Sequence, residues 1–106
     1  MPPSLADPSF NERSVDDQPR PFRNRRAADV DTVIEDHRAR LRALQSVDRA
    51  VASLVDTLRE TGELDHTVIV FSSDNGYSLG EHRFVGKNVL TRPVLQVPLL
   101  VRGPGI

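Results

Sequence analysis

An acid, an amide and a lysine in the second half of the chain are suited to binding a charged ligand. Asp74 and Asn75 follow the apolar run 67–71, and Lys87 lies thirteen residues after Asp74. Carboxylate and amide oxygens are ligands that Ca²⁺ and Mg²⁺ prefer. The lysine ammonium is a compact positive charge, and Lys87 is the single lysine among the 14 Lys and Arg residues. These residue types favour a site for a cation and an anionic group.

Two neighbouring residues bear on this interpretation. Gly76 lets the backbone turn sharply without a Cβ clash, and His82 can gain or lose a proton near neutral pH. An Asp-Asn-Gly sequence after a strand is also an ordinary turn. A histidine in a glycine-flanked loop is usually exposed or hydrogen-bonded. The residue types alone leave a plain turn open, whereas their combination and spacing favour a site.

The same stretch resembles the sulfatases of the alkaline-phosphatase-like superfamily, and specifically the C-terminal part of their catalytic domain. The similar motifs are Ser-Asp-Asn-Gly (73–76), Leu-Gly-Glu-His (79–82), Gly-Lys (86–87) and the run from Val97 to Ile106. The resemblance implies that Asp74 and Asn75 are two ligands of a divalent cation, usually Ca²⁺. It implies that Lys87 contacts the sulfate ester. His82 falls in a family motif and is a candidate catalytic residue with no assigned role.

The chain also departs from the pattern of this family. Sulfatases of this type commonly carry an acidic residue after an aromatic one, a few positions past the lysine, where this chain has Thr91-Arg92. They use a formylglycine made from Cys or Ser in a Cys/Ser-x-Pro-x-Arg motif. This chain has no Cys, and no Ser stands in that motif, so the resemblance implies a formylglycine only in the parent enzyme. Asp74 and Asn75 give two oxygens, whereas Ca²⁺ takes about six to eight ligands, and we expect the chain to be inactive alone.

The composition excludes several classes of protein. A net charge of −1 with 38% hydrophobic residues gives no reason to expect a nucleic-acid or membrane partner. No apolar run of about 18 residues predicts a transmembrane helix. The start lacks a charged region followed by an apolar core, so no signal peptide is expected and no compartment is assigned. The lack of cysteine excludes disulfides, thiolate metal sites and cysteine nucleophiles.

Two segments precede the candidate site. Residues 1–28 are rich in proline and arginine, which predicts an irregular arm, and no site is assigned to it. From Asp29 to Thr61, apolar residues recur at steps of three and four, which predicts one long α-helix. Asp29 or Asp31 is expected to cap its start, and Gly62 to end it. The apolar stripe keeps no strict heptad, which makes a coiled coil the weaker interpretation.

Two apolar runs, 67–71 and about 98–102, predict strands. The first run does not alternate, which favours a central parallel strand covered on both faces. We therefore predict an α/β chain with a partial alkaline-phosphatase-like fold, in which one long helix is followed by two strands of a parallel sheet. Two such strands with open edges are marginal alone. We expect residues 29–106 to be the C-terminal fragment of a sulfatase catalytic domain, with the N-terminal part of that domain as its partner.

The resemblance and the residues together leave three functions open. The first is a segment of a sulfatase that acts on a small-molecule or glycan sulfate ester. The second is a phosphoester or phosphonate hydrolase of the same superfamily, because a metal and a lysine also stabilise phosphate. The third is a non-catalytic module in which the apolar face of the helix binds a partner.

Overall fold

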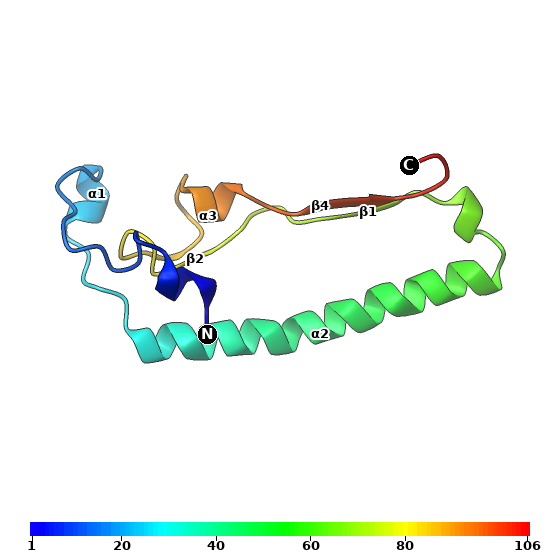
Figure 1. Cartoon of the computed structure of the whole chain (residues 1–106), viewed down its shortest axis with the longest axis horizontal. Coiled ribbons are helices and arrows are strands. Elements are labelled where there is room, and N and C mark those ends of the chain that lie inside the picture. Colours follow the sequence, from blue (N-terminus) through cyan, green and yellow to red (C-terminus); the bar gives the residue numbers. More distant parts are fainter.

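The long helix and the main strand pair lie along opposite sides of an elongated molecule (Figure 1). The computed structural model describes residues 1–106, except for the side chain of residue 21. The helices are η1 (Pro3–Ala6), α1 (Arg20–Arg23), α2 (Val30–Glu60), η2 (Leu64–His66) and α3 (Arg92–Leu95). The strands are β1 (Ile69–Ser72), β2 (Ser78–Leu79), β3 (Val85–Gly86) and β4 (Leu99–Arg102). η2 joins α2 to β1 at one end, and the N-terminal segment, β2 and α3 gather at the other.

α2 is a single helix of 31 residues with a defined cap at each end. The Asp29 carboxylate accepts hydrogen bonds from the backbone N–H of Thr32 at 2.8 Å and from its hydroxyl at 2.7 Å. Gly62 follows the last turn with a φ of 78°, and the Glu63 N–H donates to the Leu58 carbonyl at 2.9 Å. This is the glycine-terminated helix end that the sequence predicts.

The paired strands β1 and β4 are antiparallel, so the prediction of a parallel sheet is wrong. Ser72 at the end of β1 pairs with Leu99 at the start of β4. A parallel pair needs a crossover that returns the chain to the start of the first strand. Residues 73–98 instead form a turn, the β2–β3 hairpin and the short helix α3, and bring the chain back beside the end of β1. The mixed helix and strand content fits the predicted α/β class.

The N-terminal segment packs around the β2–β3 hairpin. Phe10 forms a β-bridge with Glu81, and the ring of Phe10 fills the space where a Cβ of Gly80 would lie. The Arg83 guanidinium donates to the carbonyl of Glu12 at 2.9 Å and to that of Arg13 at 2.8 Å. The helices of residues 1–28 are the short η1 and α1, and the division of the chain at residue 28 stays a prediction.

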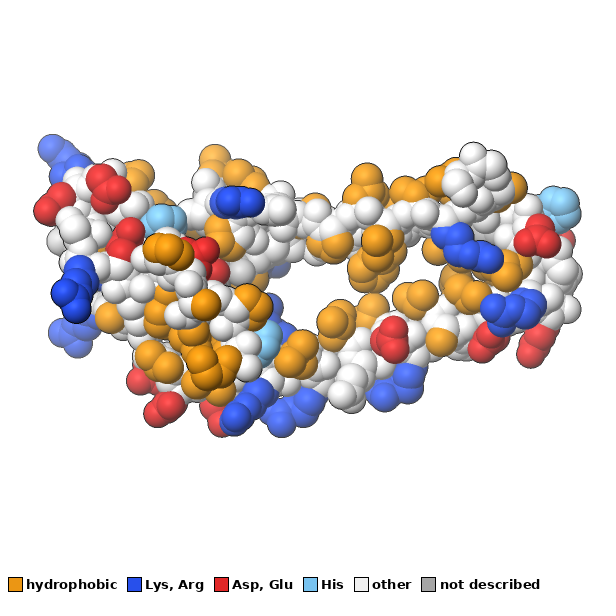
Figure 2. Space-filling model, viewed as in Figure 1, with side chains coloured by type: hydrophobic (Ala, Val, Ile, Leu, Met, Phe, Trp, Pro, Cys, Tyr) orange, Lys and Arg blue, Asp and Glu red, His pale blue; other side chains and the backbone are white. Residues whose placement is uncertain are grey.

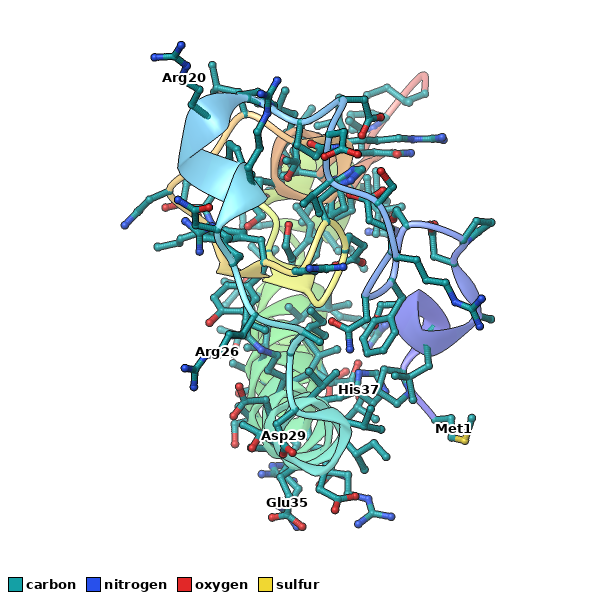
Figure 3. The ribbon with its side chains drawn as sticks, turned by 90° about the vertical axis from the view of Figure 1, so that its left-hand side faces the viewer. Met1, Arg20, Arg26, Asp29, Glu35 and His37 are labelled. Carbon is teal, nitrogen blue, oxygen red and sulfur yellow. The ribbon has the colours of Figure 1, made fainter. Side chains whose placement is uncertain are left out.

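The basic residues of this segment have different surroundings. Figure 3 looks along α2 from the end that carries Asp29, and it shows Arg20 and Arg26 pointing away from the rest of the chain. Arg25 instead lies over two aromatic rings, with its guanidinium carbon 4.4 Å from the centroid of Phe84 and 5.2 Å from that of Phe22. Arg25 therefore packs against the aromatic rings, whereas Arg20 and Arg26 extend outward.

Few apolar side chains are buried in this chain. Among the described residues, the buried hydrophobic ones are Val33, Phe84 and Val94. The side chains of β1 and β4 are largely uncovered, with Val70 61% and Leu99 69% exposed, so the two covered faces predicted for β1 are not formed within the chain. No helix in the described part of the chain is long and apolar enough to cross a membrane.

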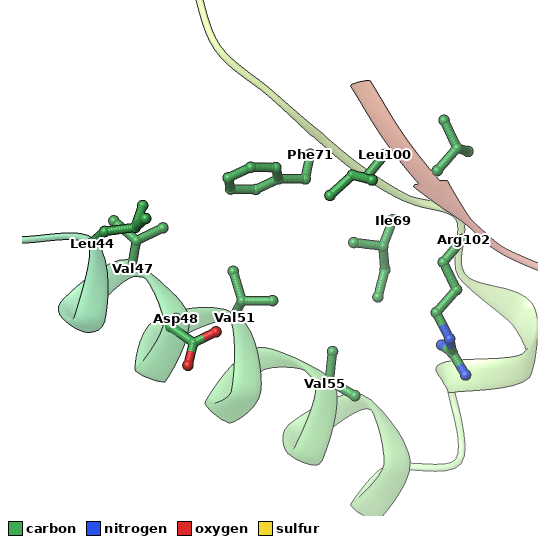
Figure 4. Close-up of a pocket in the computed structure, with 10 residues that line it drawn as sticks. Leu44, Val47, Asp48, Val51, Val55, Ile69, Phe71, Leu100 and Arg102 are labelled. Atoms are coloured by element: carbon green, nitrogen blue, oxygen red, sulfur yellow. The ribbon is translucent and has the colours of Figure 1, made fainter. Parts of the chain in front are cut away.

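An open apolar cleft separates α2 from the strands. Figure 2 shows hydrophobic side chains facing one another across this gap, and Figure 4 shows Val51 and Val55 of α2 pointing toward Ile69 and Phe71 of β1. The cleft has a volume of about 420 Å³. The helix and the sheet thus present matching apolar faces that do not close on each other.

Candidate functional site

The turn after β1 is held in place by the short helix α3. The Gly76 N–H donates to the Val94 carbonyl at 2.7 Å. A Cβ at residue 76 would collide with the carbonyl oxygen of Pro93. Glycine is therefore required here for close backbone approach, and it fixes the position of the two preceding residues, Asp74 and Asn75.

Hydrogen bonds within the turn orient the two candidate metal ligands. Oδ1 of Asp74 accepts a hydrogen bond of 2.8 Å from the backbone N–H of Asn75, and the side chain of Asp74 is exposed. The Asn75 amide nitrogen donates to the Gly76 carbonyl at 2.8 Å. Because this bond holds the amide nitrogen against the backbone, Oδ1 of Asn75 is directed away from Gly76.

The β2–β3 hairpin brings Lys87 to this turn. Ser78 pairs with Gly86, so the chain returns toward the end of β1 immediately before Lys87. Ser78 is fully buried, and its hydroxyl lies 3.2 Å from that of Thr91. The Lys87 ammonium donates to Asn75 Oδ1 at 3.4 Å. The hairpin therefore places the ammonium next to the amide, across a sequence separation of 12 residues.

Asp74, Asn75 and Lys87 line one open pocket of about 380 Å³. Its remaining walls come from the loop after Lys87 and from α3, and they are Asn88, Val89, Leu90, Val94 and Leu95. An acid, an amide oxygen and an ammonium thus face a common space with a partly apolar wall.

The donor set fits part of a divalent-cation site. Asp74 and Asn75 supply the hard oxygen ligands that Ca²⁺ prefers. No group of three or more His, Cys, Asp or Glu side chains that could hold a metal occurs among the residues the structure describes. Any cation held here must take its other ligands from substrate, water or additional protein segments.

His82 lies in a different pocket. Its Nδ1 is 2.9 Å from Glu12 Oε1, and it lines a pocket of about 440 Å³ with Gln18, Phe22 and Arg92. The backbone at His82 has a φ of 53°, which turns the chain between β2 and β3. The structure therefore joins His82 to the N-terminal segment and does not bring it to the Asp74 turn.

The structure adds Arg40 and Tyr77 to the site. The Arg40 guanidinium carbon lies 3.6 Å from the centroid of the Tyr77 ring. Both residues line a second pocket of about 400 Å³ together with Asn75, Gly76 and Lys87. The sequence patterns assigned no site residue to the helix around Arg40. The sequence did contain one signal for Arg40. A strand that follows a helix after a short turn runs back along it, so the N-terminal half of the helix lies near the C-terminal end of the strand.

Comparison with known proteins identifies the class of protein. The family model described as Sulfatase matches residues 6–106. The chain belongs to the sulfatase family, whose fold is alkaline-phosphatase-like.

Individual relatives agree with this assignment. The chain is 41% identical to an arylsulfatase of Volvox carteri over 110 residues, which cover 100% of this chain and 17% of that protein. It is 49% identical to an arylsulfatase of Chlamydomonas reinhardtii over 73 residues, or 68% of this chain and 11% of the relative. It is also 49% identical to human N-acetylglucosamine-6-sulfatase over 70 residues, which cover 65% of this chain and 13% of that protein. The chain thus spans less than a fifth of the length of these relatives. No solved structure matched it.

Proposed function

We propose that this chain supplies part of the active site of a sulfuric ester hydrolase. In this proposal Asp74 and Asn75 hold a divalent cation, Ca²⁺, and Lys87 contacts the sulfate group. The observation that carries the proposal is that these three side chains line one pocket beyond the end of β1. The names of the relatives, arylsulfatase and N-acetylglucosamine-6-sulfatase, indicate a small-molecule or glycan sulfate ester as the substrate.

The proposed roles follow from the charges of the side chains. When bound, the cation would neutralise negative charge that develops on the ester. Asp74 and Asn75 would fix its position through their oxygens, and the Lys87 ammonium would donate to a sulfate oxygen. A donor directed at developing charge lowers the barrier more than it stabilises the bound substrate.

The nucleophile is proposed to come from outside these 106 residues, because the chain has no cysteine and no serine in the formylglycine motif. We therefore propose that the chain is inactive alone and that the N-terminal part of a sulfatase catalytic domain is its partner. The apolar faces of α2, β1 and β4 that the chain leaves uncovered support this partner.

His82 is a further candidate in this proposal. Its Nδ1 contact with Glu12 leaves the other ring nitrogen, Nε2, for a proton transfer at the neighbouring pocket. Leu90 lines both this pocket and the pocket of Asp74 and Lys87. A role in catalysis would therefore require substrate that extends past Leu90.

The test compares two ester types with the full-length gene product that contains these residues. We expect hydrolysis of 4-nitrophenyl sulfate, its loss after treatment with a chelator, and its recovery on addition of Ca²⁺. Calorimetry should show weaker Ca²⁺ binding by the variant Asp74→Ala. Faster hydrolysis of 4-nitrophenyl phosphate than of the sulfate would favour the phosphoester hydrolase. Hydrolysis of neither ester would overturn the proposal.

A further inference from the structure

Two pockets meet at the contact between Asn75 and Lys87. One contains Asp74, and its other walls include apolar residues of α3 and the preceding loop. The second lies between the Asp74 turn and α2, and contains Arg40 and Tyr77. Since Asn75 and Lys87 line both, a ligand held by Lys87 in the first pocket can extend into the second.

The second pocket is positively charged. Its described lining residues include two cations, Arg40 and Lys87, and no Asp or Glu. Neither cation forms an ion pair with a carboxylate of the described residues, whereas Arg38, two positions before Arg40, lies 4.0 Å from Glu35. Two like charges that share a pocket without a counter-ion repel each other, and an anion bound between them would relieve this repulsion.

Arg40 is held in one orientation by Tyr77. With its guanidinium carbon 3.6 Å from the ring centroid, the planar group lies against the aromatic face. Such stacking is favourable for arginine and leaves the N–H groups at the edge of the plane free to donate. An arginine fixed in this way loses less conformational entropy when it binds a ligand.

We propose that Arg40 determines substrate specificity by binding a second anionic group, a sulfate or a carboxylate, on a glycan sulfate ester. The inference rests on the proposed function, in which Lys87 contacts the ester that is cleaved. Arg40 then meets a group on the same or the adjoining sugar. A guanidinium suits this role because it binds oxyanions through two parallel N–H donors.

The test uses the full-length gene product and substrates that share one scissile ester. N-acetylglucosamine 6-sulfate carries one anionic group. N-sulfoglucosamine 6-sulfate carries a second one, the sulfamate on its nitrogen, and a disaccharide of N-acetylglucosamine 6-sulfate with a uronic acid carries a carboxylate. For Arg40→Gln we expect KM to rise about 10-fold for at least one of the two dianionic substrates, as for loss of a charge-assisted hydrogen bond. KM for the monoanionic substrate should change less than about 3-fold, and kcat should be unchanged for all three substrates.

Arg42→Gln is the matched control, since Arg42 is an exposed arginine of α2 that lines neither pocket. It should leave all three KM values unchanged. Equal losses on all substrates with Arg40→Gln would place Arg40 at the scissile sulfate and overturn the proposal, as would no loss on any substrate.

A binding measurement separates this inference from the proposed function. If the gene product cleaves no sulfate ester, the proposed function fails, and calorimetry with N-sulfoglucosamine 6-sulfate and the uronate disaccharide still tests Arg40. The anion subsite would be supported if Arg40→Gln weakens the binding of at least one of these two sugars and leaves the binding of N-acetylglucosamine 6-sulfate unchanged. Equal binding of both dianionic sugars by wild type and variant, or no binding by either, would overturn it.

Discussion

At the scale of single residues, Asn75 connects the two halves of the candidate site. Its amide nitrogen is bound to the Gly76 carbonyl, and its amide oxygen accepts from Lys87. An oxygen that coordinates a cation cannot at the same time be the main acceptor for an ammonium. We therefore expect Lys87 to turn from Asn75 toward the sulfate when the cation binds, a small movement that its exposed side chain permits.

Replacing Lys87 tests the electrostatic role. In the full-length gene product, Lys87→Ala should lower kcat for 4-nitrophenyl sulfate by about 10²- to 10³-fold, the usual effect of removing one donor to a developing oxyanion. Lys87→Arg should recover only part of this rate, because the larger planar guanidinium places its donors differently. Arg26→Gln, at an outward-pointing side chain, is the control. A decrease in kcat of less than about 3-fold for Lys87→Ala would refute the assigned role.

Gly76 offers a test of how the site is built. In Gly76→Ala the added Cβ would meet the main-chain oxygen of Pro93, and the backbone must shift. We expect a loss of about 1–3 kcal/mol in the free energy of unfolding, as for overpacked positions, measured by denaturant titration of the gene product. Gly105→Ala is the control: its φ of 79° causes some strain, but nothing lies within 4 Å of the new Cβ. A larger loss at Gly105 than at Gly76 would contradict the role of the close approach to Pro93.

The residue types in the sequence point to Asp74, Asn75 and Lys87 of the first pocket but not to Arg40 and Tyr77 of the second. Asp74, Asn75 and Lys87 carry oxygens and an ammonium that have an evident use, and they lie close together in the sequence. Arg40 precedes Asp74 by more than 30 residues, and its position depends on how α2 lies relative to β1. That orientation is set by tertiary packing, which the helical periodicity of α2 does not encode.

At the scale of secondary-structure elements, the sequence pattern predicts that β4 is a strand but not its direction relative to β1. A short apolar run predicts a strand, but the run is the same whether its partner is parallel or antiparallel. The direction depends on what residues 73–98 do, and here they form the β2–β3 hairpin and α3 instead of a crossover helix. Gly80 and Gly86, both with positive φ, mark that hairpin in the sequence.

The N-terminal cap of α2 makes the stability of this helix depend on pH. Hydrogen bonds from the Thr32 backbone N–H and then its hydroxyl lower the pKa of Asp29 below its usual value of 3.8. Because the folded pKa is lowered, the cap stabilises the helix fully above the usual value and loses this effect as the pH falls through the lowered pKa. The helical circular dichroism of the chain and its thermal midpoint should therefore fall in strongly acidic solution.

Asp29→Asn provides the comparison, since asparagine also caps helices but has no carboxyl to titrate. The variant should have a weaker acid dependence of the thermal midpoint than the wild-type chain. Identical acid dependence in the two proteins would show that the titration of Asp29 does not affect the stability of α2.

At the scale of the whole molecule, the chain is more extended than its length requires. Its radius of gyration is 18.4 Å, whereas a compact domain of this length has about 13 Å. Its accessible surface is 7924 Å², whereas a folded monomer of this mass has about 5,900 Å². The excess surface includes the apolar faces of α2, β1 and β4, which a further layer of protein would bury.

The apolar cleft predicts where the proposed N-terminal part of the catalytic domain binds. Val51 lines the cleft with its side chain pointing toward β1. In the proposed interface, which has to exclude water, Val51→Glu would bury a charge at a cost of about several kcal/mol. Ser53→Glu adds the same charge on the exposed opposite side of α2 and is the matched control.

The measurement is fragment complementation. The chain and the proposed N-terminal part of the catalytic domain are expressed separately, mixed, and assayed with 4-nitrophenyl sulfate. We expect activity with the wild-type chain and with Ser53→Glu, and at least about a 10-fold weaker apparent affinity with Val51→Glu. If Val51→Glu complements as well as Ser53→Glu does, the cleft is not the surface that receives the rest of the domain. The exposed outer faces of β1 and β4 would then be the surfaces to test, because they are the other large apolar areas of the described chain.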